Sequence, residues 1–133
     1  MGVAWAPIFK KEFPGADSFE RATDGKNMSR NMYRLDEICA DKGVTAFSTF
    51  APDWEELEAE LPVEELTEGD FWFSSAKGLR TVSVLIAALR AEKQWSKELR
   101  KSQVGYLLWD LLELERVLKV AKQKRAQFYL LRY

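Results

Sequence analysis

Residues 101–124, KSQVGYLLWDLLELERVLKVAKQK, decide the fold because their apolar side chains recur three and four residues apart. This spacing places them on one face of a helix. The residues on that face are Val104, Leu107, Leu111, Leu114, Leu118 and Ala121. Leu108 and Leu112 widen the face at its flank. So broad an apolar face predicts a central helix.

Two other stretches show the same helical spacing. In 74–92 the residues on the shared face are Leu79, Val82, Ile86 and Leu89. In 28–42 they are Met28, Met32, Leu35 and Cys39. Ser74 or Ser75 suits the N-cap of the first helix, and Gly43, which can adopt the left-handed conformation, ends the second. We expect both helices to pack against 101–124 through their apolar faces.

The two ends of the chain predict a small sheet. Residues 127–133, QFYLLRY, contain no helix breaker and are rich in aromatic residues and leucine, which is typical of a terminal strand. Its partner is either 3–9 or 45–47, and the rest of 1–25 reads as irregular or short-strand structure. We therefore predict a single globular domain over 1–133 of mainly α class. It is a three-helix-type bundle with a short antiparallel sheet that includes the C-terminal strand.

The composition excludes several kinds of active site. The 133 residues include no histidine and a single cysteine, Cys39. This removes Ser-His-Asp and Cys-His catalysis, and metal or haem sites that need histidine or several thiolates. One cysteine forms no internal disulfide, which fits a reducing compartment. Any catalysis would have to rest on carboxylates, lysine, tyrosine or an unusual serine.

The sequence predicts neither export nor membrane insertion. The N-terminus does not have the order of charged and apolar residues of a secretory signal. The longest nearly apolar run, 82–89, is far shorter than the roughly 20 residues that span a bilayer. The cations that end 101–124 are favoured there by the helix dipole. We expect a cytoplasmic protein that binds neither a membrane nor nucleic acid.

Charge is distributed unevenly along the chain. Residues 1–76 carry 16 acidic and 7 basic side chains, whereas residues 77–133 carry 5 acidic and 13 basic ones. From Asp53 to Asp70 there are nine carboxylates and no Lys or Arg. Pro52 suits the first position of a helix, so we expect a short acidic helix after it. Neighbouring like charges in this stretch repel one another.

Three interpretations of the acidic stretch 53–70 stay open. It is a solvated face that pairs with basic residues of the same molecule, a docking site for a protein partner or an identical subunit, or a site for a divalent cation. The stretch lacks the order of residues of a calcium-binding loop. We expect no metal ion and no other cofactor.

Three consecutive aromatic residues follow the acidic stretch, and their side chains cannot all face one way. We expect at least one ring to be exposed or to lie in an interface. The candidate binding residues are Glu55, Glu56, Glu60, Asp70, Phe71, Trp72 and Phe73. Together with these aromatics, Trp54, Trp95 and Trp109 are candidates to line a ligand cleft.

The carboxylates of 101–124 are not predicted to be catalytic. Asp110, Glu113 and Glu115 are spaced for surface pairing with Arg116 and Lys119. Acid–base catalysis by two carboxylates needs different environments for the two groups. Ser74 and Lys77 match the Ser-x-x-Lys pattern, but the accompanying Lys-Thr-Gly motif is absent, and an N-cap explains the serine.

Three short segments, Gly78–Val82, Leu85–Ile86 and Asp110–Leu118, resemble a group of small bacterial proteins, several of them cyanobacterial, to which no activity is assigned. The resemblance covers roughly the last 60 residues and implies a bacterial, cytoplasmic protein. Our leading hypothesis is a non-enzymatic interaction or regulatory protein that binds a protein partner or forms a homodimer. The alternative is an enzyme dependent on a small molecule or a divalent metal, with its site in 53–70.

Overall fold

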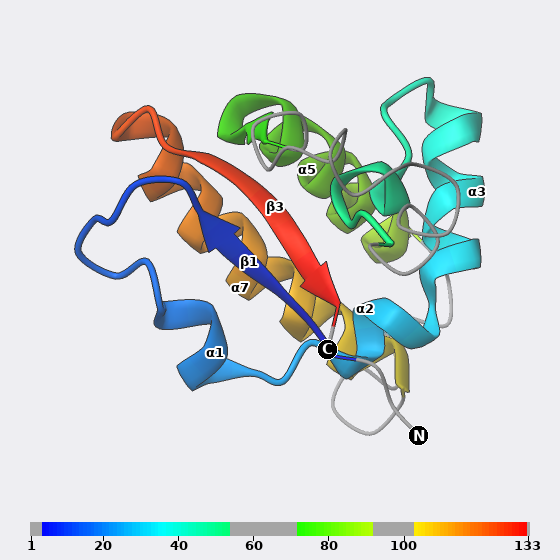
Figure 1. Ribbon diagram of the computed structural model, residues 1–133. Coiled ribbons are helices and arrows are strands. Elements are labelled where there is room, and N and C mark those ends of the chain that lie inside the picture. Colours follow the sequence, from blue (N-terminus) through cyan, green and yellow to red (C-terminus); the bar gives the residue numbers. More distant parts are fainter. Residues whose placement is uncertain (1–3, 54–71, 92–102, 133) are drawn as a thin grey trace.

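Two long helices, α5 (Ser75–Ala91) and α7 (Gln103–Gln123), pack against each other in the computed structural model of the chain (Figure 1). The structure describes residues 4–53, 72–91 and 103–132. The leucine-rich faces meet, and their buried side chains include Val82, Leu85, Leu89, Leu107, Leu111, Leu114 and Leu118. Both helices therefore form where the apolar spacing predicts them.

The sheet consists of β1 (Trp5–Phe9), β2 (Phe73–Ser74) and β3 (Gln127–Arg132), in the order β1-β3-β2. Both pairings are antiparallel. The C-terminal strand β3 lies in the centre, with Trp5 opposite Arg132 and Phe9 opposite Phe128. Of the two expected partners, the N-terminal stretch pairs with β3. Residues 45–47 form no strand, and Phe47 begins a 3₁₀ helix instead.

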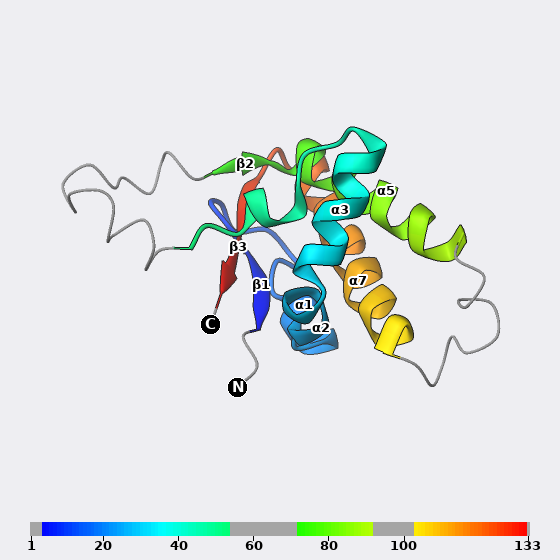
Figure 2. The same cartoon turned by 90° about the vertical axis from the view of Figure 1, so that its right-hand side faces the viewer.

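The helices lie on one side of the sheet, as Figure 2 shows. Phe128 and Leu130 of β3 are buried in the core shared by the two layers. Gly78 of α5 lies against the ring of Phe128, and a β-carbon at Gly78 would overlap that ring. The missing side chain lets α5 approach the sheet closely. The predicted class, a mainly α bundle with a small antiparallel sheet that includes the C-terminal strand, is confirmed.

The N-terminal third contains more helix than the sequence predicts. The helices are α1 (Ser18–Ala22), α2 (Lys26–Arg30), α3 (Met32–Lys42) and the 3₁₀ helix η1 (Phe47–Phe50). The single helix predicted over 28–42 is therefore two helices that meet at Asn31. The predicted irregular stretch 1–25 contains α1, which is too short for a recognisable apolar period.

Gly25 begins α2 in the left-handed conformation, with φ of 73°. A β-carbon at this position would collide with the backbone carbonyl of Trp5. The amide of Trp5 in turn donates a hydrogen bond to the carbonyl of Gly25 at 3.4 Å. Glycine is thus required both for the backbone angle and for the close approach of β1.

Both predicted helix ends are confirmed. Ser74 is the N-cap of α5, because its Oγ accepts a hydrogen bond from the amide of Lys77 at 3.1 Å. The Oγ of Ser75 has another role, since it donates to the carbonyl of Ala126 at 2.5 Å and ties α5 to the start of β3. Gly43 ends α3 in the left-handed conformation, with φ of 70°.

Two further expectations from the sequence are an acidic helix after Pro52 and a chain that does not enter a membrane. The acidic helix expected after Pro52 lies outside the described residues. Among the helices of the described residues, none is long and apolar enough to cross a membrane.

Candidate functional site

Most of the candidate binding residues predicted from the sequence lie outside the described part of the chain. They are Glu55, Glu56, Glu60, Asp70 and Phe71, together with Trp54 and Trp95 of the expected aromatic cleft. Trp72 and Phe73 are described, and both are half-buried. These two aromatic residues follow the acidic stretch in the sequence.

Trp72 and Phe73 pack against the sheet and its neighbours. The ring of Trp72 meets Tyr129 of β3 edge-on, with 4.9 Å between the centroids. Phe73 begins β2 opposite Phe128, and its ring meets Phe50 of η1 at 5.1 Å. The two rings therefore contact different partners. Neither ring is fully exposed.

The exposed aromatic side chains lie elsewhere. Among the described residues, the large hydrophobic side chains classed as exposed are Tyr33 on α3, at 80%, and Tyr106 and Trp109 on α7, at 60% and 54%. Tyr106 and Trp109 are three residues apart and are therefore neighbours on the surface of α7. Glu113 and Arg116 continue the same row. We call Tyr106, Trp109, Glu113 and Arg116 the α7 face.

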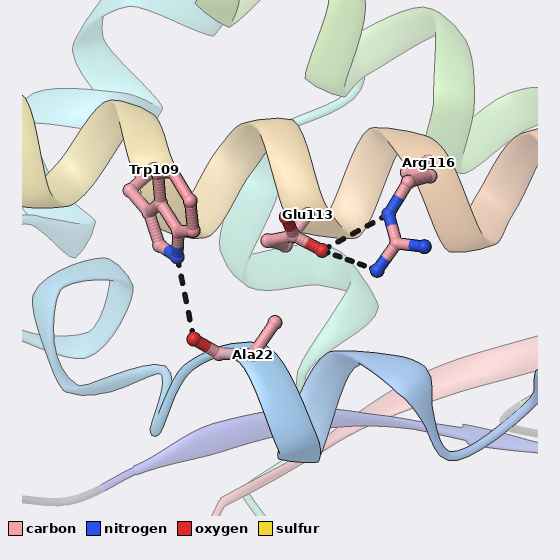
Figure 3. A network of polar contacts seen from close by, with 4 residues as sticks. All are labelled: Ala22, Trp109, Glu113 and Arg116. Carbon is pink, nitrogen blue, oxygen red and sulfur yellow. Dashed lines mark hydrogen bonds and ion pairs between the residues drawn. The ribbon is translucent and has the colours of Figure 1, made fainter.

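Trp109 is held in position by a hydrogen bond. Its indole Nε1 donates to the carbonyl of Ala22, the last residue of α1, at 3.3 Å (Figure 3). The bond satisfies the polar edge of the ring and leaves more than half of the side chain exposed. The indole is thus both fixed and accessible.

The guanidinium group of Arg116 is held by Glu113, which lies one turn before it on α7. The Nε and Nη2 atoms of Arg116 both donate to Oε2 of Glu113, at 3.0 Å and 2.6 Å (Figure 3). Glu113 is largely buried, whereas the side chain of Arg116 is 59% exposed. The contact fixes the orientation of the guanidinium group and leaves its outer edge accessible to a second acceptor.

Asp110, next to Trp109 in the sequence, is buried with an exposed fraction of 1%. Its Oδ1 accepts a hydrogen bond from the hydroxyl of Thr23. The amides of Asn27 and Met28, at the start of α2, face the carboxylate, although its Oδ2 has no partner in hydrogen-bonding geometry. Asp110 therefore takes the place of a side-chain cap for α2, whose own N-cap residue is Gly25.

Burial is the main cause that raises the pKa of Asp110 above its ordinary value. The hydrogen bond from Thr23 lowers the pKa and the nearby charge of Asp24 raises it. The amides of Met28 and Asn27 also lower the pKa, but the net effect is a raised pKa, which favours the neutral carboxyl. A buried acid of this kind is a candidate proton carrier, yet here its contacts are with the backbone and hydroxyl that hold α1 to α2.

The surface pairing predicted for the carboxylates of α7 is confirmed for two residues and wrong for the third. Glu113 pairs with Arg116, and Glu115 pairs with Lys119 at 3.5 Å. Asp110 makes no such pair. It lies three residues after Leu107 and four before Leu114, so its position is on the buried face of the helix. That register is the signal in the sequence that indicates its burial.

The exposure of the α7 face as one surface was also not predicted from the sequence. Trp109 was a candidate only as one wall of a ligand cleft. The signal for its exposure is that Trp109 and Tyr106 fall outside the leucine stripe, on the side of the helix that carries Glu113 and Arg116.

No group of three or more carboxylate or cysteine side chains that could hold a metal ion occurs within residues 4–53, 72–91 and 103–132. Comparison of the chain with models of protein families, with curated proteins and with solved structures found no match. What bears on function is therefore the chemistry of the described surface.

Proposed function

We propose that the protein is a non-enzymatic interaction or regulatory protein that binds another protein through the α7 face. The observation that supports this is the indole of Trp109, which is fixed by Ala22 and more than half exposed. Full burial of a large apolar side chain contributes about 1.5–3 kcal/mol, and the exposed part of the Trp109 side chain leaves a share of this unused. A partner with an apolar pocket would gain that share by covering the ring.

The composition of the α7 face also favours a protein partner. Trp, Tyr and Arg are the residues that most often dominate the binding energy of protein interfaces. Tyr106 and Trp109 provide apolar area with few rotatable bonds, and Arg116 provides donors that are already oriented by Glu113. The expected partner has an apolar pocket flanked by a carboxylate or carbonyl oxygen.

A protein fits this face better than nucleic acid does. Arg116 shares its charge with Glu113, so the row does not present the uncompensated cations that bind a phosphate backbone. The proposed partner therefore meets an aromatic surface with local, paired charges.

We keep a bacterial cytoplasm as the proposed location. Cys39 is buried in the core, and burial raises the pKa of its thiol, so the thiol needs no oxidising environment and is poorly reactive. The acidic stretch 53–70, which lies outside the described residues apart from Asp53, stays a proposed second contact of the partner.

Site-specific photo-crosslinking in cells of the source organism tests the proposed function. A benzophenone amino acid replaces Tyr106, and in a second variant it replaces Tyr33, an exposed tyrosine on α3. The two positions carry the same residue type, and both are open to solvent, so they form a matched pair. We expect an adduct with one specific protein from position 106 that position 33 does not give.

Two results would count against this function. One is the absence of any specific adduct from position 106, and the other is the same set of adducts from both positions. Replacing Trp109 with Ser in the position-106 variant should abolish the adduct, because it removes the neighbouring anchor. An adduct that survives this change would show that the contact does not depend on the α7 face.

A further inference from the structure

The outer side of α7 carries a row of side chains with the spacing of a coiled-coil seam. Tyr106, Trp109, Glu113, Arg116 and Val120 follow one another at intervals of 3, 4, 3 and 4 residues. These are the intervals between the a and d positions of a heptad. Figure 3 shows Trp109, Glu113 and Arg116 in this order along one side of α7. Val120 is half-buried, so an apolar side chain follows the α7 face one turn further along the helix.

The row is complementary to itself when its direction is reversed. Trp109 lies seven residues before Arg116, and Glu113 lies seven residues before Val120. The pair Glu113 and Arg116 therefore has the same midpoint along α7 as the pair Trp109 and Val120. When a second α7 lies antiparallel with Glu113 opposite Arg116, each Trp109 lies opposite Val120 of the second copy. The charges then lie at the centre of the contact, with an apolar pair on each side of them.

The ion pair within each copy leaves one donor atom and one acceptor atom unused. Arg116 bonds through Nε and Nη2, and both bonds go to Oε2 of Glu113. Nη1 of Arg116 and Oε1 of Glu113 take no part in these bonds. In the antiparallel arrangement the Nη1 atom of each copy faces the carboxylate of the other, which joins the four charged groups into one network.

The same charges disfavour a parallel arrangement. Two parallel copies of α7 would place Arg116 opposite Arg116 of the second copy and Glu113 opposite Glu113. Like charges at such close range repel each other. The charge pattern therefore selects the antiparallel pair.

We propose that the partner of the α7 face is the same face of a second copy of the chain, in an antiparallel pair of α7 helices about a two-fold axis. This inference rests on the proposed function, because it names the partner of the same surface. The second copy supplies an apolar side chain, Val120, for Trp109 and a carboxylate, Glu113, for Arg116. Both copies use the same surface, so the association stops at a dimer. The net charge of −1 leaves little long-range repulsion between copies.

Sedimentation equilibrium of the purified chain gives the first test. We expect the mass to rise from monomer to dimer as the protein concentration increases, and no further. Glu113→Arg places an arginine opposite Arg116 of the second copy, and Arg116→Glu places a glutamate opposite Glu113. Each variant alone should therefore be monomeric.

Mixing the two variants distinguishes contact between copies from pairing within one copy. An equal mixture should form a dimer, because both central pairs then join an acidic and a basic side chain. Within each variant, residues 113 and 116 carry like charges, so mixing restores nothing inside one molecule. Recovery of the dimer in the mixture is thus specific to contact between copies.

Two control variants carry the same changes of charge at exposed positions on other helices. They are Glu37→Arg on α3 and Arg90→Glu on α5, and both should dimerise like the wild type. Circular dichroism shows whether each variant is folded. Trp109→Ser, at an exposed position, keeps the test open if a variant of Glu113 does not fold. It should weaken the dimer more than tenfold, because loss of an interface anchor typically costs about 2 kcal/mol or more.

Three results would overturn the second copy as the partner. They are a wild-type chain that is monomeric up to its solubility limit, a mixture of folded variants that stays monomeric, and a Trp109→Ser chain that dimerises as the wild type does. Photo-crosslinking from position 106 then separates this failure from failure of the proposed function. An adduct with a different protein would leave the proposed function standing, whereas the absence of any adduct would contradict both.

Discussion

Asp110 and Asp36 each place a carboxylate at the start of a short helix that belongs to another part of the chain. Asp110 of α7 faces the first amides of α2, and Asp36 of α3 accepts hydrogen bonds from the amide and hydroxyl of Ser48, at 2.9 Å and 2.5 Å, near the start of η1. Neither α2 nor η1 has a cap from its own N-cap side chain. Rules that search for Ser, Thr, Asp or Asn just before a helix cannot find caps that come from a distant segment.

The pH dependence of stability should report the burial of Asp110. Because its pKa is raised in the folded chain, folding favours the neutral carboxyl. The favourable contribution is complete below the ordinary pKa of 3.8 and is lost as the pH rises through the raised value. Asp110→Asn, which cannot ionise, should therefore be more stable than the wild type at pH 7, by a margin that shrinks towards pH 3.8.

Urea unfolding of both chains across this pH range measures the margin. Asp110→Ala is the matched control, because it removes the charge and the acceptor together. It leaves the hydroxyl of Thr23 and the amides at the start of α2 without their partner, and should be less stable than Asp110→Asn by about 1–3 kcal/mol at every pH. An Asn variant whose deficit grows as the pH rises would show that the charged carboxylate stabilises the fold.

Gly78 should resist substitution although it lies within a helix. In an exposed helix, alanine is more favourable than glycine by about 1 kcal/mol. Here the added methyl group meets the buried ring of Phe128, and overpacking of this kind costs about 1–3 kcal/mol. Thermal unfolding should show a lower Tm for Gly78→Ala. A Tm equal to or above that of the wild type would mean that α5 and β3 can move apart at no cost.

At the scale of elements, the long periodic segments were predictable and the short ones were not. The leucine spacing is enough to place α5 and α7, because each buries a continuous face. The break at Asn31 does not interrupt the apolar spacing of 28–42, so the sequence pattern is the same for one helix as for two. The five residues of α1 are too few to show a period.

The sequence predicts the C-terminal strand of the sheet but leaves two candidates for the strand that pairs with it. The aromatic and leucine content of 127–132 indicates a strand but does not name its neighbour. β1 is selected by tertiary contacts, among them the ring of Trp5 stacked on Phe47 at 5.7 Å and the guanidinium of Arg132 at 4.9 Å over the Trp5 ring. These contacts join residues that lie far apart in the sequence.

The contact between α3 and η1 should depend on Asp36. Asp36→Ala removes the acceptor for both groups of Ser48 and should lower the free energy of unfolding by about 1–3 kcal/mol. Ser48→Ala removes the hydroxyl and keeps the amide bond, so its loss should be smaller. Denaturant unfolding of the two variants checks this order. Equal losses would indicate that the hydroxyl carries the whole contact.

In the folded molecule, the acidic and basic side chains that are separated along the sequence are only partly separated in space. On α7 the carboxylates Glu113 and Glu115 neutralise Arg116 and Lys119 locally. Other exposed cations, such as Lys26, Lys77 and Lys124, have no ion pair within the described residues, and they lie on different elements. A net charge alone cannot show which cations are paired, because the pairing depends on which side chains the fold brings together.

The candidate site was less predictable than the fold for a related reason. Burial faces of helices follow from periodicity, whereas a binding surface is defined by which side chains stay exposed after packing. Trp109 and Trp5 are the same residue type, and only the assembled structure separates the buried ring from the exposed one. The binding role of Glu55, Glu56 and Glu60 stays a prediction.

Capture of the binding partner by a chain with two changes in the α7 face tests the central claim most directly. Tyr106→Ser with Trp109→Ser should reduce the captured partner by more than tenfold relative to the wild type, because removing an interface anchor typically costs 2 kcal/mol or more, and about 1.4 kcal/mol corresponds to tenfold. Tyr33→Ser should capture the wild-type amount. Retention of the partner by the double variant within about twofold of the wild type would contradict the account.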